Sequence, residues 1–367
     1  MQRKKRSMPP ALMLGALLAV VVIIVLLVWS VGGSSSSGMT GRASRLGALP
    51  GQNVTPFGDD VLYYDGTMLQ CVSDTGSTRW NFQIGANAGF SAGNQRVVAW
   101  SANQLYALNA RGQNTYNNRM NSEIQFARVG KGYIAAFVGT SDTGTIYVID
   151  NDGASVDAIA VQDMTLLDMD FFTVGDSEYL WVLGIDTSGT VISTVLQTYQ
   201  PGRLVLGNTT LGEQLVYDVY YTNDHLYVVD TRKIRAYDYR ITRDQNVSDV
   251  LIYGWYLEDM RRVGNTSYQL LVPAAIDNES GGMTTLRLMY GSTDRVMHLP
   301  AGCIGAALGS KSVYAFSSTH VYRCRYGEQT FTAYTMPVQI SQVLGMLEDD
   351  KVIVASGSET YVIELPS

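Results

Sequence analysis

A hairpin pattern recurs eight times between residues 61 and 367, and it limits the folds open to this chain. Each unit has an apolar strand, a tight polar turn and a second, alternating strand. The first strands begin near Val61, Val97, Tyr133, Tyr179, Leu226, Tyr268, Val313 and Val352. A period of about 40 residues is typical of propeller blades, which contain four short strands. The sequence therefore predicts an all-β fold, an eight-bladed β-propeller. Seven blades are the alternative if the unit near Tyr179 or Tyr268 is irregular.

The two ends of this repeat region are expected to meet. Residues 361–365 form the third strand of the eighth unit, and too few residues follow them for a fourth. Residues 45–49, before the first unit, can supply the missing strand. Such pairing closes the ring and removes two free sheet edges.

The N-terminal segment predicts a membrane anchor. Arg3, Lys4, Lys5 and Arg6 precede an uncharged apolar run, residues 11–31. As a helix, this run would rise about 31 Å, which matches a hydrocarbon core of about 30 Å. Basic residues before a helix keep the N-terminus cytoplasmic. A cleaved signal peptide is the alternative, although its apolar core usually has about 7–15 residues. We expect a single-pass protein of the cell membrane.

This interpretation divides the chain into four parts. Residues 1–10 are a cytoplasmic basic tail, 11–31 a transmembrane helix, 32–43 a Gly/Ser linker and 44–367 an extracytoplasmic β-propeller. The whole chain has a formal charge of −7, with 26 basic and 33 acidic residues. Since four of the basic residues precede the helix, the exported part is more acidic still. That balance disfavours nucleic acid and anionic lipid as partners. Basic runs such as Arg232, Lys233 and Arg235 are expected at solvated edges.

Three cysteines cannot form a disulfide framework. Cys71 and Cys324 fall on second hairpin strands, and Cys303 falls on the strand that leads into the seventh unit. Cys303 and Cys324 would lie on strands that are not neighbours, too far apart for a bridge. We expect all three to be small buried residues. An exported protein without disulfides fits a bacterial envelope, and we expect a Gram-positive source.

A family resemblance is found in residues 61–82. Asp65-Gly66 forms a hairpin turn, an alternating strand follows, and a Thr75-Gly76 turn leads into Trp80-Asn81-Phe82. This order resembles the repeat of the PQQ-like, quinoprotein-type β-propeller superfamily. The layout also resembles uncharacterised membrane-anchored propellers of Gram-positive anaerobes. Quinoprotein dehydrogenases need a stacking platform, a calcium ion and a catalytic Asp, and they commonly have a vicinal disulfide. This sequence has no Cys-Cys pair and no cluster marked as calcium ligands, so the resemblance favours the noncatalytic, protein-binding members. No cofactor and no catalytic residue are expected.

Several short motifs have simpler explanations. Asp74-Thr75-Gly76-Ser77 and Asp142-Thr143-Gly144-Thr145 look like the paired motifs of an aspartic protease. Their turns would lie on opposite faces of a propeller, so the two carboxylates could not share a proton. Residues 150–153 start like a calcium loop, but Ser155 and Val161 occupy the positions where that loop needs glycine and glutamate. His225, His298 and His320 have no further ligand at suitable spacing, so no metal site is predicted.

Aspartates recur in the turns inside the hairpins. Five of the eight turns contain one, namely Asp65, Asp142, Asp186, Asp230 and Asp277. These turns emerge on one propeller face, where the carboxylates could surround the channel mouth and bind a basic partner or a cation. The loop of Asp277, Asn278 and Glu279 is the longest and the best candidate for a contact. The alternative is that Asp is simply a favoured turn residue.

Together these features favour a noncatalytic protein over an enzyme. We expect a membrane-anchored extracytoplasmic propeller that serves as a binding scaffold for an envelope protein or a wall polymer. The alternative is a small-ligand sensor or an enzyme that uses the central channel. The sequence leaves the oligomeric state open.

Overall fold

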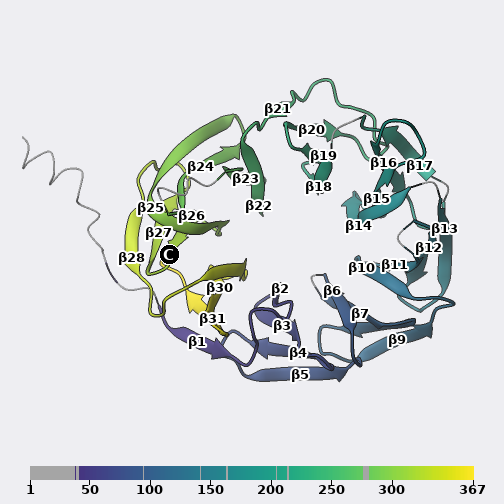
Figure 1. The fold of residues 1–367 in the computed structure, drawn as a ribbon, viewed down its shortest axis with the longest axis horizontal. Helices are drawn as coiled ribbons and strands as arrows, with labels where there is room; N and C mark the ends of the chain where they lie inside the picture. Colours follow the sequence, from purple (N-terminus) through teal and green to yellow (C-terminus); the bar gives the residue numbers. More distant parts are fainter. Residues whose placement is uncertain are drawn as a thin grey trace, which may run out of the picture.

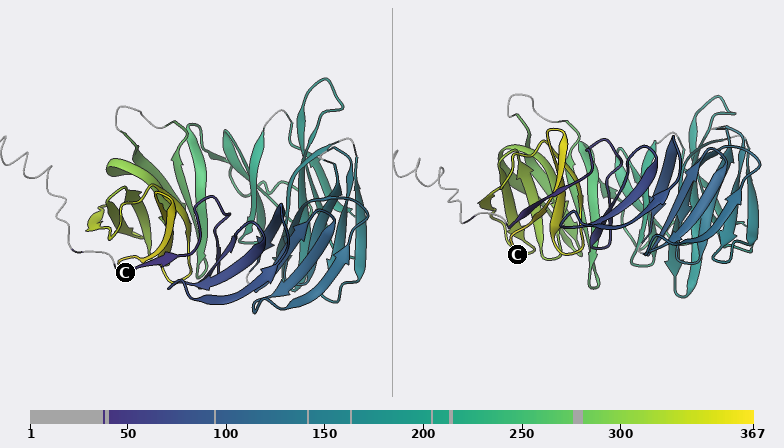
Figure 2. Two further views of the ribbon diagram at one scale, coloured as in Figure 1. Left: turned by 60° about the horizontal axis from the view of Figure 1, so that its bottom comes forward. Right: turned by 90° about the horizontal axis from the view of Figure 1, so that it is seen from below.

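The computed structural model describes residues 38, 41–93, 95–140, 142–162, 164–203, 205–212, 215–275 and 281–367. In these residues the regular structure consists of strands, numbered β1 to β31, and no helix occurs. The strands form antiparallel sheets that are arranged in a ring (Figure 1). In edge-on views, the strands run between the two faces of the ring (Figure 2). This arrangement confirms the all-β prediction and is that of a β-propeller.

Five four-stranded sheets follow one another in chain order. The first contains β2 (Thr55–Phe57), β3 (Asp60–Tyr64), β4 (Met68–Ser73) and β5 (Thr78–Gln83). The second contains β6 (Ala88–Ala92), β7 (Arg96–Ser101), β8 (Gln104–Asn109) and β9 (Asn114–Arg119). The third contains β10 (Ile124–Val129), β11 (Tyr133–Gly139), β12 (Gly144–Asp150) and β13 (Ser155–Val161). The fourth contains β14 (Thr165–Val174), β15 (Ser177–Asp186), β16 (Ser193–Tyr199) and β17 (Val205–Thr210). The fifth contains β18 (Val216–Thr222), β19 (His225–Asp230), β20 (Lys233–Tyr237) and β21 (Val250–Leu251).

A seven-stranded sheet comes next. Its strands are β22 (Trp255–Val263), β23 (Thr266–Pro273), β24 (Met283–Tyr290), β25 (Thr293–Leu308), β26 (Ser312–Ser317), β27 (His320–Arg325) and β28 (Thr332–Thr335). The central strand, β25, has 16 residues and pairs with a strand on each side. Its first part, up to His298, pairs mainly with β24, whereas its last part, from Cys303 to Leu308, pairs with β26.

The last sheet joins the two ends of the described chain. It contains β29 (Gln342–Met346), β30 (Lys351–Ser356), β31 (Glu359–Glu364) and, at its outer edge, β1 (Ala43–Leu46). β1 pairs antiparallel with β31, from Ala43 opposite Ile363 to Leu46 opposite Thr360. The predicted closure is therefore confirmed, with the strand two residues earlier than expected.

The predicted hairpins are confirmed as the second and third strands of successive units. Each of the eight predicted first strands begins within two residues of the start of a real one, namely β3, β7, β11, β15, β19, β23, β26 and β30. These strands lie inside the sheets and have neighbouring sheets on both sides, so their two faces are both apolar. Val61 of β3 packs toward the last sheet, while Leu62 packs toward the second. The core is thus a series of layers between adjacent sheets.

The cysteine prediction is also confirmed. Cys71, Cys303 and Cys324 are free and buried. Cys303 on β25 and Cys324 on β27 are separated by β26. Burial raises the pKa of the Cys71 and Cys303 thiols to about 12, so both are unreactive thiols.

Several predictions fall outside the described residues. They are the basic tail, the transmembrane helix, most of the linker, and the loop of Asp277, Asn278 and Glu279. Within the part of the chain that the structure describes, no helix is long and apolar enough to cross a membrane.

Candidate functional site

The turn aspartates lie where the sequence predicted them. Asp65 lies between β3 and β4, Asp142 between β11 and β12, and Asp186 and Asp230 end β15 and β19. Each therefore sits at the connection between the second and third strands of its sheet. Because the second strands of all the sheets run from the same face of the ring to the other, these connections emerge on one face. We call it the turn face.

Their carboxylates are engaged within their own turns. Asp65 Oδ1 accepts hydrogen bonds from the backbone N–H groups of Thr67 and Met68, at 3.0 and 2.8 Å. Asp186 Oδ1 accepts one from Ser188 N–H at 2.8 Å. Burial disfavours the ionised form of Asp65, but its hydrogen bonds outweigh burial and lower the pKa. Turn capping thus accounts for aspartate at these positions, and a role in binding stays a prediction.

Asp142 and Asp230 differ in their surroundings. Asp142 Oδ1 accepts a hydrogen bond from Thr165 Oγ1 at 2.8 Å, which links the third sheet to the fourth. Asp230 is only 5% exposed and accepts hydrogen bonds from the N–H groups of Arg232 and Lys233. A carboxylate this buried offers little surface to a partner.

A β-bulge recurs, in six of the eight units, in the strand that precedes the hairpin. Figure 1 shows β6, β10, β14, β18 and β22 pointing toward the centre of the ring. The register shifts at one equivalent place in β10, β14, β18, β22, β25 and β29. Each shift lies opposite the last residues of the second strand, beside the turn face. The extra residues, which we call the rim residues, are Gln125, Leu167, Tyr217, Glu258, Ile304 and Leu344.

The bulges expose large apolar side chains next to the channel. Leu167, Tyr217 and Ile304 are 40, 36 and 39% exposed. A bulge redirects the side chain of the extra residue, and bulges are frequent beside functional sites. The rim therefore combines a fixed backbone with accessible apolar groups.

Tyr217 pairs with a second exposed tyrosine, and we call this pair, together with three exposed apolar residues close to it in sequence, the aromatic patch. The Tyr217 ring packs edge to face against that of Tyr256, with centroids 5.6 Å apart. The Tyr217 hydroxyl accepts a hydrogen bond from Leu257 N–H at 3.1 Å, so β18 is held to β22. Other exposed apolar residues flank this pair in sequence. The aromatic patch consists of Leu215, Tyr217, Leu251, Tyr253 and Tyr256, which are between 36 and 63% exposed.

Aspartates follow the bulge in three consecutive units. They are Asp168 on β14, Asp218 on β18 and Asp259 on β22. Asp168 forms an ion pair with Arg128 of β10 at 2.6 Å. The pKa of Asp218 is raised, chiefly by burial and also by the charge of Asp168. Burial likewise raises the pKa of Asp259.

Two further carboxylates extend this acidic side of the channel. Asp170, two residues beyond Asp168, has its pKa raised to about 6 by burial, while its bond from Phe171 N–H works against the rise. Burial, followed by the charge of Asp259, raises the pKa of Glu258. The charges of Arg128 and Arg261 oppose the rise at Asp170 and Asp259 but do not cancel it. Carboxylates that have lost hydration in this way favour a positively charged ligand.

A cavity of about 880 Å³ lies beside these carboxylates, and its lining includes Glu258 and Asp259. It is lined by β22, the end of β25, β29 and residues near β2. The position after the bulge is glycine here: a Cβ on Gly345 would meet Pro56 at 2.9 Å, and one on Gly305 would meet Val343 at 3.1 Å. Arg261 spans the cavity wall, donating hydrogen bonds to the carbonyl oxygens of Leu308 and Glu348.

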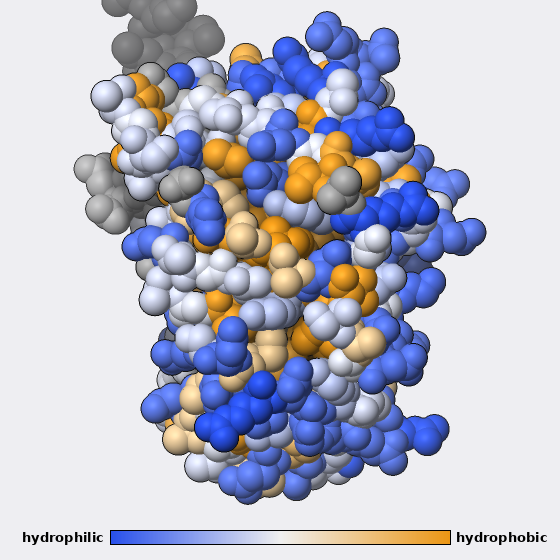
Figure 3. All heavy atoms as spheres, turned by 90° about the vertical axis from the view of Figure 1, so that its right-hand side faces the viewer, coloured by the Kyte–Doolittle hydropathy of each residue, from blue (hydrophilic) through white to orange (hydrophobic). Residues whose placement is uncertain are grey.

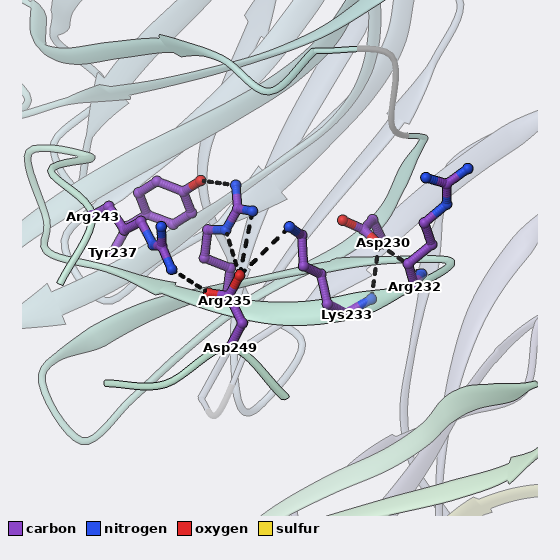
Figure 4. Close-up of polar contacts among 7 residues, drawn as sticks. All are labelled: Asp230, Arg232, Lys233, Arg235, Tyr237, Arg243 and Asp249. Atoms are coloured by element: carbon purple, nitrogen blue, oxygen red, sulfur yellow. Dashed lines mark hydrogen bonds and ion pairs between the residues drawn. The ribbon is translucent and has the colours of Figure 1, made fainter. Parts of the chain in front are cut away.

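The basic run on β20 does not form a solvated edge. Lys233, Arg235 and Arg243 surround Asp249, at 3.5, 3.3 and 3.0 Å (Figure 4). The Lys233 and Arg235 side chains are about one-fifth exposed. The expectation of solvated side chains holds for Arg232, which is exposed, and was wrong for Lys233 and Arg235. Asp249, directly before the neighbouring strand β21, draws these two side chains together.

The motifs that look like an aspartic protease or a calcium loop in the sequence are turns in the structure. Asp74 lies between β4 and β5 and pairs with Lys351 at 3.0 Å, on the face opposite to that of Asp142. Asp150 Oδ1 accepts hydrogen bonds from the N–H groups of Asp152 and Ala154. His225 contacts Asp244 at 2.8 Å. Among the residues described, no group of three or more His, Cys, Asp or Glu could hold a metal ion.

The rim residues and the aromatic patch were missed by the sequence analysis. A signal exists, since Leu167-Asp168, Tyr217-Asp218 and Glu258-Asp259 occupy the same place in three successive repeats. The hairpin pattern does not contain this signal, because the pairs lie on the strand before each hairpin.

The fold is similar to that of several solved structures. BamB from Moraxella catarrhalis is 11% identical, with a TM-score of 0.54, and the match covers 89% of this chain and 99% of BamB. Sqt1 from Saccharomyces cerevisiae is 10% identical, with a TM-score of 0.57, and the match covers 90% of this chain and 98% of Sqt1. AztD from Citrobacter koseri is 10% identical, with a TM-score of 0.52 and coverage of 84 and 93%. At such identities the likeness is one of fold alone.

Sequence comparison gives a single kind of match. No curated protein matches the chain. One family model, described as "Family of unknown function (DUF5711)", matches residues 47–365.

Proposed function

We propose that this chain, which belongs to the family of unknown function DUF5711, is a noncatalytic binding scaffold. In this account, a membrane-anchored, extracytoplasmic β-propeller presents its turn face to an envelope protein or a wall polymer. The observation that carries the proposal is the aromatic patch beside the channel. Exposed aromatic residues on a rigid backbone are typical of protein interfaces.

The architecture is proposed in more detail than the sheets alone give. We count eight blades by dividing the seven-stranded sheet at β25, whose two parts pair with different neighbours. Each blade then has four strands, and the last contains β1. We also keep the PQQ-like superfamily as a proposal, which the motif in residues 61–82 supports.

The location is inferred from the sequence alone. The apolar run at 11–31 and the basic residues before it support a single-pass anchor with a cytoplasmic N-terminus. A short linker would keep the propeller close to the membrane. A partner at the cell envelope of a Gram-positive bacterium follows from this placement.

The test is capture from intact cells. Tagged full-length protein is crosslinked in its own host, purified and analysed by mass spectrometry beside a Tyr217→Ser, Tyr256→Ser double variant. The matched control is Val205→Ser on β17, whose side chain is 50% exposed on the outer wall. We expect a stoichiometric partner that is lost with the double variant and kept with the control. Capture of the protein alone in every case would overturn the scaffold.

One observation favours a second function. The cavity of about 880 Å³ is large enough for a small ligand and contains both carboxylates and a guanidinium. A sensor or enzyme that uses the channel would therefore bind a zwitterionic or polar compound there. Thermal-shift screening of amino acids, sugars and peptides tests it. A ligand whose stabilising effect disappears in Glu258→Gln would support the second function, and no shift with any compound would count against it.

A further inference from the structure

The aromatic patch and the acidic side of the channel lie together. Tyr217 is followed directly by Asp218, and Tyr256 lies two residues before Glu258. The two rings are in contact, so these four residues come from two adjacent first strands at one place on the turn face. An apolar surface and a set of carboxylates are thus offered to the same molecule.

The patch is held in shape before any partner arrives. The Leu257 N–H to Tyr217 hydroxyl bond fixes one ring across the boundary between two sheets. The edge-to-face contact fixes the other ring relative to it. A tyrosine that is already ordered loses little conformational entropy on binding, which favours affinity.

The nearby charges are unbalanced. Three arginines beside these groups are already engaged: Arg128 pairs with Asp168, and Arg261 donates to two carbonyl oxygens. Arg287, which donates to the Leu251 carbonyl oxygen, pairs with Asp294. Asp218, Glu258 and Asp170 have no ion pair in the described part of the chain. Burial has raised the pKa of each of these three carboxyls, so an added cation would relieve a cost that exists in the free protein.

This chemistry selects among partners. Carboxylates repel an anionic polymer or nucleic acid. Tyrosine faces attract lysine and arginine side chains as well as apolar groups. A protein segment that alternates basic and apolar side chains would satisfy both parts of the site.

We propose that the aromatic patch, with Asp218 and Glu258, is a docking site for a basic peptide segment of a protein partner, with an apolar or aromatic residue that packs against the exposed surface of the Tyr217–Tyr256 pair. This inference rests on the proposed scaffold function and names the partner's chemistry. It predicts affinity that depends on both charge and apolar contact and that weakens as salt screens the carboxylates.

The outer wall offers a useful contrast. Figure 3 faces the side of the ring that carries β13 and β17 and shows hydrophobic residues among hydrophilic ones. Val205 is half exposed there, and Asp152 is exposed in the turn between β12 and β13, on the opposite face from the patch. These residues supply matched controls of similar chemistry.

The experiment measures binding of three labelled peptides to the full-length chain in nanodiscs of uncharged lipid. The first probe alternates arginine with leucine and contains one tryptophan. The second has glutamate in place of arginine, and the third has serine in place of leucine and tryptophan. Fluorescence anisotropy is read after subtracting empty nanodiscs. We expect the first probe to bind at least about tenfold more tightly than either of the others.

Variants then locate the site. Asp218→Asn with Glu258→Gln keeps the shape and removes the charge, and should weaken the first probe about tenfold. Tyr217→Phe with Tyr256→Ser should also weaken binding of the first probe about tenfold, without changing the salt dependence of that binding. Asp152→Asn with Val205→Ser should leave binding unchanged. Equal binding of the charge-reversed peptide, or equal weakening by the control variant, would overturn the proposal.

Two other outcomes separate this inference from the function on which it rests. If cells yield a partner that is lost with the patch variant, yet the three peptides bind alike, the scaffold stands and the basic peptide is wrong. If light scattering shows a dimer that Tyr256→Ser abolishes, the occupant is a second copy of this chain and the inference is overturned. If no partner is captured, both fail.

Discussion

Asp259 and Leu308 join two inner strands of the ring by a direct hydrogen bond, in which Leu308 N–H donates to Asp259 Oδ2 at 2.8 Å. Two residues farther along β22, Arg261 Nη1 donates to the Leu308 carbonyl oxygen at 3.1 Å. Both backbone groups of Leu308 are therefore satisfied by side chains of the preceding unit. Arg261 Nη2 also reaches the carbonyl oxygen of Glu348, so one guanidinium ties together β22, β25 and the region after β29.

Replacing Arg261 with alanine should destabilise the fold. The change leaves the partly buried Leu308 carbonyl oxygen and the exposed Glu348 carbonyl oxygen without their charged donor. Hydrogen bonds to charged groups contribute about 1.5–3 kcal/mol each. We expect a loss of about 2–4 kcal/mol in the free energy of unfolding, measured by urea denaturation. Arg262→Ala is the control, because Arg262 is exposed and bonds only within its own hairpin. Equal losses for the two variants would contradict a bracing role for Arg261.

Ring closure by β1 should be a large contribution to stability. Leu46 is 2% exposed and packs with Ile353 and Val362. Leu46→Ala should cost about 2–5 kcal/mol, the range for buried leucines. Leu49→Ala, at a 54% exposed position just beyond the strand, should cost little. Thermal unfolding of both variants provides the comparison, and similar melting temperatures would show that the closing strand is dispensable.

Stability should depend on pH through Asp170. Its pKa is about 6 in the folded protein, above the value of about 4 for an unfolded aspartate. The folded state therefore binds the proton more tightly, and this stabilisation is present at low pH and is lost as pH rises from about 4 to 6. Because Asp170 as a whole residue keeps exposed surface although its carboxyl has lost hydration, we expect an effect of about 1 kcal/mol or less.

Asp170→Asn should remove this dependence. The variant should be as stable as the native chain near pH 4 and more stable at pH 7, as measured by denaturant unfolding across the range. Carbon-13 NMR of the aspartate carboxyls, with the variant used for assignment, reports the titration directly. A signal that titrates near pH 4 would refute the raised pKa.

The turn aspartates offer a separate test of the acidic-ring hypothesis. Asparagine at Asp65, Asp142 and Asp186 together keeps a side-chain acceptor in each turn but removes three charges. If these carboxylates bind a basic partner, capture from cells should weaken markedly while the fold persists. Unchanged capture would leave turn capping as their whole role and would direct attention to the rim.

The hairpins could be predicted from the sequence because their strands are sandwiched between sheets. Val97, Val98 and Ala99 are all fully buried, so β7 appears as an uninterrupted apolar run. Closure by β1 was predictable for a related reason, since an open last sheet would leave two edges. In both cases the local sequence pattern agrees with what the whole fold requires.

The strands that precede the hairpins were harder to predict. They face the channel on one edge, so polar and apolar residues are mixed, as in the exposed Leu167 beside Asp168. A bulge also shifts the alternation by one residue in the middle of the strand. The aromatic patch depends on contact between β18 and β22, which are about 40 residues apart. No local pattern in a single sequence reports such a contact.

Site-specific photo-crosslinking in living cells tests the central claim most directly. A photoreactive residue is placed at Tyr256 on the turn face and, in a second strain, at Asp152 on the opposite face, and the products are identified by mass spectrometry. The account predicts a discrete crosslink to one other protein from position 256 and none from position 152. Crosslinks from position 152 alone, or none from either, would contradict a binding site on the turn face.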